Sequence, residues 1–348
     1  MMRRLVMLGL ALALCGFSIG TPIASFDGAT QWLNSSALTP ADLHGKVVLV
    51  DFWEYTCLNC LRTLPYLREW YKRYRNDGLV IVGVHTPEFG FSGEASQVDS
   101  NAKRLDVTWP IALDDNRTVW NHFGVNVWPT ELLYDQNGHL VEAQVGEGNY
   151  PYTESKIQAL LKAANPSLSL PPLMALLPQD SYDKPGAVCY PQTGEVLVSH
   201  RPIADPPAFG GDPSTDLSYH DKGSHHDGDI YLDGYWKATR EAVVFGGGSG
   251  YFAMTYHAIE VTAVLTPSKG TTRVNVTQDG QPLPHDDAGS DIHYDATGAS
   301  YVDVDASRSY HLVENKTFGT HDLHLYPQAY GLGVYDVDFE SCEVPGAH

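Results

Sequence analysis

The sequence predicts a two-domain protein, with an α/β domain first and an all-β domain second. In the first half, short apolar segments such as 47–53 and 79–84 alternate with helical patterns, which is typical of a three-layer α/β sheet. In the second half, apolar and polar residues alternate with a period of two, which favours a β-sandwich or jelly roll. The length of 348 residues also exceeds the ~250–300 residues at which single cores stop growing.

A proline-rich stretch over 165–184 separates the two patterns and has no periodicity of its own, so we interpret it as a linker. This interpretation places the first domain at 21–164 and the second at 185–348. The elements expected in the first domain are an edge strand at 32–33, strands over 47–53, 79–84, 109–113, 130–134 and 140–145, and helices over 96–105, 118–123 and 153–164, besides the helix that follows Cys57.

Residues 1–20 have the features of a secretory signal peptide. A short basic start precedes an apolar run from Leu5 to Cys15, and small residues stand before Thr21. The run is too short to cross a bilayer, which needs ~20 apolar residues. We therefore expect cleavage and a location outside the cytoplasm, in the periplasm. Lipid anchoring through Cys15 is less favoured, because Leu14 occupies the position where a lipobox has a small residue.

The charge of the chain argues against one class of partner. Acidic residues outnumber basic ones by 42 to 22, which gives a formal net charge of −20. Such a surface repels phosphate groups, so nucleic-acid binding is not expected. We attribute the excess of acid to solubility and do not interpret it as a metal site.

The candidate reactive site is the cysteine pair Cys57 and Cys60. The apolar segment 47–53 leads into it, and a one-sided apolar pattern follows, so Cys57 is expected at the first turn of a helix. The unpaired N–H groups and the positive dipole end there stabilise a thiolate, which can lower a cysteine's pKa from ~8.5 to ~3.5–7.5. Zinc binding is disfavoured because a tetrahedral site needs four ligands, and Cys189 and Cys342 are distant single cysteines.

Four landmarks in chain order resemble the thioredoxin superfamily. They are a strand at 49–53 with Asp51 six residues before Cys57, Pro65 at the position of the family's helix kink, the sequence Trp128-Pro129-Thr130 like the family's cis-proline loop, and a following hairpin over 131–145. The Leu58-Asn59 dipeptide departs from the common Gly-Pro of thioredoxin, and the interval from Cys57 to Pro129 is longer. With the segments 55–65 and 83–89, this longer interval is similar to TlpA-like proteins and closest to the extracytoplasmic part of DipZ-type proteins.

The resemblance implies a thiol-disulfide oxidoreductase that needs no cofactor beyond its own redox-active disulfide. Cys57 would attack a substrate disulfide, Cys60 would resolve the mixed disulfide, and Asp51 would assist deprotonation of Cys60. Pro129 in cis would present neighbouring backbone to an extended substrate segment. The side chains expected to contact the substrate are Trp53, Tyr55, Trp128 and Thr130.

The resemblance also implies partners. DipZ-like proteins receive electrons through a CcdA-like membrane donor, so reduction of substrate proteins that contain disulfides is the favoured direction, although a dithiol can run either way according to its potential. A thiol peroxidase is one alternative, but Thr56 abuts Cys57, whereas a peroxiredoxin-like site has its threonine three residues before the cysteine. The other alternative is a glycan- or protein-binding adaptor with an inactive thioredoxin scaffold.

Glu54, His85 and Glu88 are further candidates for proton transfer. His85 and Glu88 follow a parallel-type strand, so they should emerge at the edge of the sheet that carries Cys57. Polar loop residues near any dithiol would show the same pattern. Asp51 is the stronger candidate because it alone is both expected to be buried and matched by a motif.

In the second domain, Cys189 and Cys342 fall in the first and last strand regions, and we predict a structural disulfide between them in an oxidising compartment. The resemblance to carbohydrate-binding modules raises glycan binding by aromatic side chains, for which the candidates are Tyr231, Tyr235, Trp236, Tyr251, Phe252 and Tyr256. We favour the core for Trp236, because a buried Trp contributes much area to a small sandwich.

A histidine-rich segment of the second domain contains His220, His225 and His226. It could bind a metal, but we interpret it as a solvated loop, because a lone cluster lacks the fixed geometry that metals require.

Overall fold

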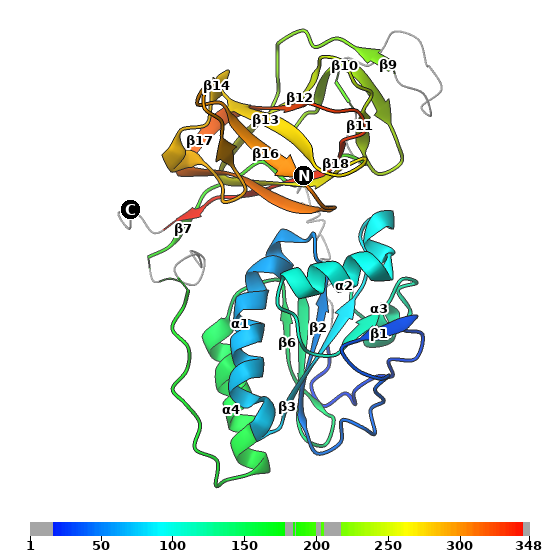
Figure 1. Cartoon of the computed structure of the whole chain (residues 1–348). Coiled ribbons are helices and arrows are strands. Elements are labelled where there is room, and N and C mark those ends of the chain that lie inside the picture. Colours follow the sequence, from blue (N-terminus) through cyan, green and yellow to red (C-terminus); the bar gives the residue numbers. More distant parts are fainter. Residues whose placement is uncertain (1–16, 178–183, 185, 200–202, 205–216, 344–348) are drawn as a thin grey trace, which may run out of the picture.

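Figure 1 shows the computed structural model of the chain, which describes residues 17–177, 184, 186–199, 203–204 and 217–343. The expected signal peptide lies almost wholly outside these residues. Within them, no helix is both long and apolar enough to cross a membrane. The described chain forms an α/β domain and, over the ends of its sheet, a domain built of strands.

The first domain contains a six-stranded mixed sheet with the order β1-β4-β3-β2-β5-β6. Its strands are β1 (Gln31–Leu33), β2 (Val47–Trp53), β3 (Leu79–His85), β4 (Ile111–Leu113), β5 (Thr130–Tyr134) and β6 (Leu140–Val145). The strands β2, β3 and β4 run parallel, and the other pairings are antiparallel. Every residue of β2 is buried, because apolar cores lie on both faces of the sheet.

Four α-helices accompany the sheet: α1 (Leu58–Tyr74), α2 (Ala95–Arg104), α3 (Thr118–Phe123) and α4 (Tyr150–Ala164). The helices α1, α2 and α4 contribute to the core on one face, and α3 contributes to the core on the other. The expected helices and strands of this domain are confirmed, with bounds that differ by up to three residues. The largest difference is at α4, which begins at Tyr150 instead of the expected residue 153. Pro151 fits in its first turn, because the backbone N–H that proline lacks has no partner within the helix there.

The stretch expected to be a free linker is packed against the first domain as far as it is described. The backbone N–H of Met174 donates to Glu154 Oε2 at 2.7 Å, and that of Leu177 donates to the Tyr66 hydroxyl at 2.9 Å. Apolar side chains of this stretch also pack on the core beneath α1 and α4, among them Leu168 and Leu170. Residues 165–177 therefore belong structurally to the first domain.

The second domain is all-β, and its named strands pair only antiparallel. One 11-stranded sheet contains β8 (Val196–Leu197), β9 (Leu217–Tyr219), β10 (Tyr231–Ala238), β11 (Val243–Phe245), β12 (Tyr251–Thr266), β13 (Thr272–Gln278), β14 (Gln281–Pro282), β15 (His293–Tyr294), β16 (Ser300–Val304), β17 (Arg308–Pro327) and β18 (Gly333–Glu340). The expected two sheets are joined into one, because β12 pairs with β10 at its start, with β18 at its end and with β17 along most of its length.

This sheet encloses a single apolar core. Trp236 lies in it with 0% exposure, so the core interpretation of this residue is confirmed. Phe252 and Tyr256 are equally buried and cannot stack on a sugar in this structure, whereas Tyr235 is 55% exposed.

The predicted disulfide between Cys189 and Cys342 is confirmed. It joins β7 (Val188–Cys189) to β19 (Cys342–Glu343), which form a separate two-stranded ladder. The bond closes a loop of 153 residues that contains almost the whole second domain.

The histidine-rich segment is not uniformly solvated, so that expectation is wrong for one residue. The side chain of His220 is 88% exposed, but that of His225 is only 7% exposed. The sequence pattern missed this because the partners that bury His225 come from other strands, among them Tyr231, on whose ring it stacks at 4.2 Å.

The two domains meet on the side that carries the cysteine pair. Arg62 of α1 forms ion pairs with Glu260 at 2.8 Å and Glu340 at 2.7 Å, both from the second domain. Close by, the rings of Phe89 and Phe91 pack edge-on against Tyr335 at 5.4 and 4.9 Å. The second domain therefore covers the end of the sheet where α/β folds place their sites.

Candidate active site

The cysteine pair lies where β2 ends and α1 begins. Cys57 is the N-cap of α1, and its sulfur accepts a hydrogen bond from the backbone N–H of Cys60 at 3.3 Å. The Cys60 thiol also donates to Cys57 Sγ at 2.6 Å. Cys57 is half-buried and Cys60 is completely buried, so access favours Cys57 as the attacking thiol.

The predicted low pKa of Cys57 is wrong in direction. Burial raises the pKa of this thiol, and the carboxyl groups of Glu54 and Glu88 raise it further, which outweighs the two hydrogen bonds from Cys60. Sequence reasoning counted the helix terminus but not the acids that surround it.

Glu54 explains why the helix terminus does not stabilise a thiolate strongly. This buried carboxylate accepts hydrogen bonds from the backbone N–H groups of Thr56 and Cys57, and from the Thr56 hydroxyl. The donors expected to face the thiolate are thus bonded to a negative charge instead. Buried His85 lies beside it, with Nε2 3.6 Å from Glu54 Oε1.

Cys60 holds its proton more strongly than Cys57. Burial raises its pKa well above the usual value, and Cys57 and Asp51 add to the effect. Asp51 is itself completely buried, and neither of its carboxyl oxygens has a hydrogen-bond partner among the described residues. Its pKa is raised to about 8 by burial, so Asp51 can gain or lose a proton near neutral pH.

Glu131 is a buried acid on the strand beside Asp51 that the sequence analysis missed. It lies opposite Asp51 in the β2–β5 register and is 4% exposed. Burial raises its pKa well above the usual value, with further contributions from Asp51 and Glu142. The available signal was a charged residue inside the otherwise apolar stretch 130–134.

The cis-proline loop is confirmed in its backbone, since the Trp128–Pro129 peptide bond is cis. Trp128 is half-buried, with its ring 4.7 Å from that of Trp120 and 4.9 Å from the Arg117 guanidinium. Val127 and Trp128 line the same cavity as Cys57, which places this loop beside the reactive thiol.

Three of the four expected substrate contacts are buried, so that expectation is wrong for them in this structure. Trp53 and Tyr55 are 0% exposed and Thr130 is 1% exposed. Trp53 and Thr130 lie on strands that are covered on both faces, and Tyr55 lies in the buried turn that follows β2, so these side chains support the site from beneath. Tyr55 stacks on His85 at 5.4 Å, for example. Only Trp128 reaches the cavity.

A cavity of about 430 Å³ lies between Cys57 and the second domain. Its lining residues are Cys57, Leu58, Asn59, Glu88, Asn126, Val127 and Trp128 from the first domain and Gln192, Glu195, Asp336 and Asp338 from the second. Burial raises the pKa of each of its four acids, that of Glu88 to about 8. Asp336 is 6% exposed, and its Oδ1 has no hydrogen-bond partner among the described residues. The cavity thus gathers four acid groups with raised pKa values around the opening at Cys57.

Both domains match known families. Residues 19–143 match the AhpC/TSA family, and residues 207–339 match the family described as the thioredoxin like C-terminal domain. DipZ of Mycobacterium bovis and of Mycobacterium tuberculosis is 32% identical over 269 residues, which cover 73% of this chain and 36% of DipZ. The chain therefore spans little more than a third of these relatives.

Other relatives match a shorter part of the chain. The thiol-disulfide oxidoreductase ResA of Bacillus thuringiensis is 29% identical over 125 residues, which cover 36% of this chain and 67% of ResA. The solution structure of a thioredoxin-like protein in the oxidized form is 26% identical with a TM-score of 0.40, covering 42% of this chain and 99% of that one. The chain is thus similar to DipZ over 73% of its length and to the thiol-disulfide oxidoreductase ResA over 36%, and an AhpC/TSA match is followed by a match to the thioredoxin like C-terminal domain.

Proposed function

We propose that the chain is an extracytoplasmic reductase of protein disulfides. The observation that carries this proposal is the asymmetry of the dithiol. Cys57 opens onto a cavity, whereas Cys60 lies beneath it, protonated and next to an acid that titrates near neutral pH. The location outside the cytoplasm rests on the features of residues 1–20.

The reaction begins when the Cys57 thiolate attacks one sulfur of a substrate disulfide. The substrate S–S bond breaks, and its other sulfur leaves as a thiolate and takes a proton from solvent. Cys60 then loses its proton toward Asp51 and attacks Cys57 Sγ, which breaks the mixed disulfide and releases the second substrate thiol. Two electrons have passed to the substrate, and a Cys57–Cys60 disulfide remains. A dithiol donor must reduce it again, and a CcdA-like membrane protein is the donor we propose.

Trapping of the mixed disulfide tests the assignment of roles. Cys60→Ser should accumulate covalent complexes with disulfide-containing proteins, because the attacking thiol remains and the resolving thiol is absent. Cys57→Ser should capture almost nothing and is the matched control. Non-reducing electrophoresis of both variants gives the readout, and equal trapping by the two would reverse the roles.

The reduction potential of the Cys57/Cys60 couple tests the direction. A value near or below that of thioredoxin, ~−270 mV, supports a reductant, whereas a value near ~−120 mV would make the protein an oxidant. Equilibration with glutathione or dithiothreitol buffers, followed by alkylation, measures it directly.

A further inference from the structure

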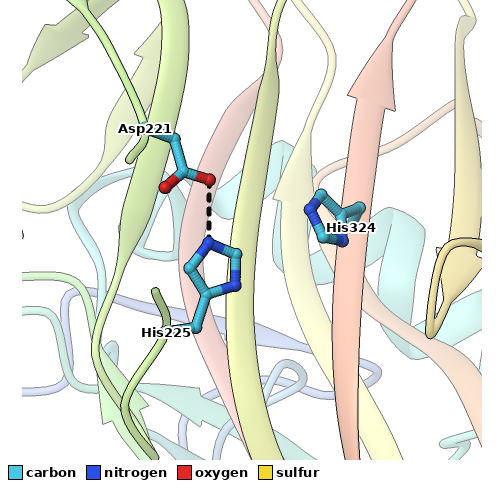
Figure 2. Close-up of side chains that lie close together, drawn as sticks. All are labelled: Asp221, His225 and His324. Carbon is cyan, nitrogen blue, oxygen red and sulfur yellow. Dashed lines mark hydrogen bonds and ion pairs between the residues drawn. The ribbon is translucent and has the colours of Figure 1, made fainter. Parts of the chain in front are cut away.

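Three side chains from distant parts of the second domain converge on one point. Asp221 and His225 belong to the segment between β9 and β10, and His324 belongs to β17. Figure 2 shows Asp221 bonded to His225, with His324 opposite them on its strand. One possible ligand atom from each lies within 4.8 Å of the others.

We propose that Asp221, His225 and His324 bind a divalent transition-metal ion, with Zn²⁺ as the expected occupant. One carboxylate oxygen and two imidazole nitrogens are a donor set that zinc prefers, and three protein ligands leave a fourth position for water. Zinc–ligand bonds of ~2.0–2.2 Å place the ligand atoms of a tetrahedral site roughly 3.3–3.6 Å apart. The separation of 2.8 Å between Asp221 Oδ2 and His225 Nε2 and the limit of 4.8 Å for the whole set bracket this spacing.

The contacts around these ligands are those that a metal site needs. His225 Nδ1 lies 2.6 Å from Asp322 Oδ1, so a carboxylate orients the ring and leaves Nε2 for the metal. Asp221 is held in turn, because its Oδ2 accepts from the Tyr251 hydroxyl at 2.9 Å and its Oδ1 accepts from the Gly223 N–H at 2.7 Å.

Burial separates this cluster from a chance group of surface residues. The side chains of Asp221, His225 and His324 are only 1%, 7% and 14% exposed. Without any metal, His225 could simply bridge the two acids, with Nε2 bonded to Asp221 and Nδ1 bonded to Asp322. This arrangement holds His324 only weakly, because the buried Nδ1 of this residue lies 3.6 Å from Asp322 Oδ2 and makes no hydrogen bond to any described residue. A bound ion satisfies this third side chain as well.

The metal would fasten the segment that precedes β10 to β17. These segments are about 100 residues apart in the chain, so a metal bond between them restricts the unfolded ensemble as a cross-link does. The ion is therefore expected to stabilise the fold of the domain, and its fourth position stays open to water.

Zinc titration of the full-length, untagged protein tests the proposal. The protein is first stripped with a chelator and then oxidised, so that Cys57 and Cys60 cannot take the metal. We expect one Zn²⁺ per chain by calorimetry, together with a rise in the melting temperature. His324→Gln and His225→Ala should abolish this binding, and Asp322→Asn should weaken it ~10–100-fold. His220→Ala, which removes an exposed histidine of the same segment, is the matched control and should bind as the native protein does.

Cobalt provides a second readout that does not depend on stability. Co²⁺ in a tetrahedral site absorbs visible light strongly, and this absorption should appear in the native protein and in His220→Ala but not in His324→Gln. Near-UV circular dichroism shows whether each variant is folded. Zinc binding that survives in folded His324→Gln, or that is absent from the native protein, would overturn the proposal and leave Asp221, His225 and Asp322 as an internal ion-pair network.

Discussion

At the scale of single residues, buried acids set the chemistry of the dithiol. The N-terminus of α1 would stabilise a thiolate, but Glu54 accepts hydrogen bonds from its backbone N–H groups, and Glu88 lines the cavity onto which Cys57 opens. Both acids raise the pKa of Cys57, after burial itself. The Cys57 thiol is thus less readily ionised than an ordinary cysteine, and its reactivity depends on how much negative charge its neighbours carry.

Replacement of Glu88 tests this dependence. The pKa of Glu88 is raised to about 8 by burial, so its negative charge develops mainly at alkaline pH. Glu88→Gln removes the charge, and we expect the pKa of Cys57 to fall and alkylation above pH 8 to become several-fold faster. Rates of iodoacetamide alkylation against pH measure this in the Cys60→Ser background. Glu94→Gln, at an exposed acid nearby, should leave the profile unchanged. An identical profile for Glu88→Gln would show that this acid does not act on the thiol.

Asp51 links the site to the pH dependence of stability. Its pKa is about 8 in the folded protein against 3.8 for an ordinary aspartate. Between these values the folded state keeps a proton that the unfolded state releases, so stability falls as pH rises from about 4 to 8. Asp51→Asn should remove this loss and stabilise the protein, by less than 1 kcal/mol near pH 4 and by about 2–5 kcal/mol near pH 8, since each pKa unit is worth about 1.4 kcal/mol.

Urea unfolding at pH 5 and pH 8 measures the effect, with Asp27→Asn at an exposed site as the control. A gain that does not grow with pH would mean that Asp51 titrates normally. The same variant should turn over protein disulfides more slowly, because Cys60 loses its proton acceptor.

At the scale of elements, the hydrophobic pattern predicts the bounds of a helix or strand wherever its buried residues recur with a regular period. The strand 47–53 and the helix 118–123 have the predicted bounds. The packing of residues 165–177 could not be predicted, because a proline-rich stretch has no period and its anchors, Glu154 and the Tyr66 hydroxyl, are contacts between distant segments. For the same reason the acids around the dithiol were incompletely identified. The motif located Cys57, Cys60 and Asp51, but the burial of Glu131 and the role of Glu54 depend on neighbouring strands and turns.

The packed stretch predicts where the first domain ends. A fragment of residues 21–177 should be more stable than one of residues 21–166 by about 1–3 kcal/mol, because it keeps the half-buried apolar side chains and the two backbone hydrogen bonds to Glu154 and Tyr66. Thermal and urea unfolding of the two fragments measure the difference. Equal stability would show that the stretch only rests on the surface of the domain.

At the scale of the whole molecule, the second domain limits access to the reactive thiol. The cavity of about 430 Å³ beside Cys57 has the size of a small-molecule site, ~300–1,000 Å³, and closes on its far side against β18. A disulfide held in a folded protein needs more room than this. The proposed reduction of such a substrate therefore requires the domains to separate, and the contacts between them would set how often they do.

Arg62 is the residue through which this control can be tested. It lies two residues after Cys60 and bonds Glu260 and Glu340 of the second domain. Arg62→Gln removes the cation that these two carboxylates share with Glu147 of the first domain, which lies 3.4 Å from the guanidinium, and this costs far more than the loss of an exposed pair would. The closed arrangement should weaken, and Cys57 should react several-fold faster with a protein disulfide such as that of insulin. Its rate with a small aromatic disulfide should stay nearly constant, because that reagent already fits the cavity. Arg62→Lys keeps the charge and is the control. Equal acceleration with both substrates would mean that Arg62 acts on the thiol itself and that domain separation does not limit the reaction.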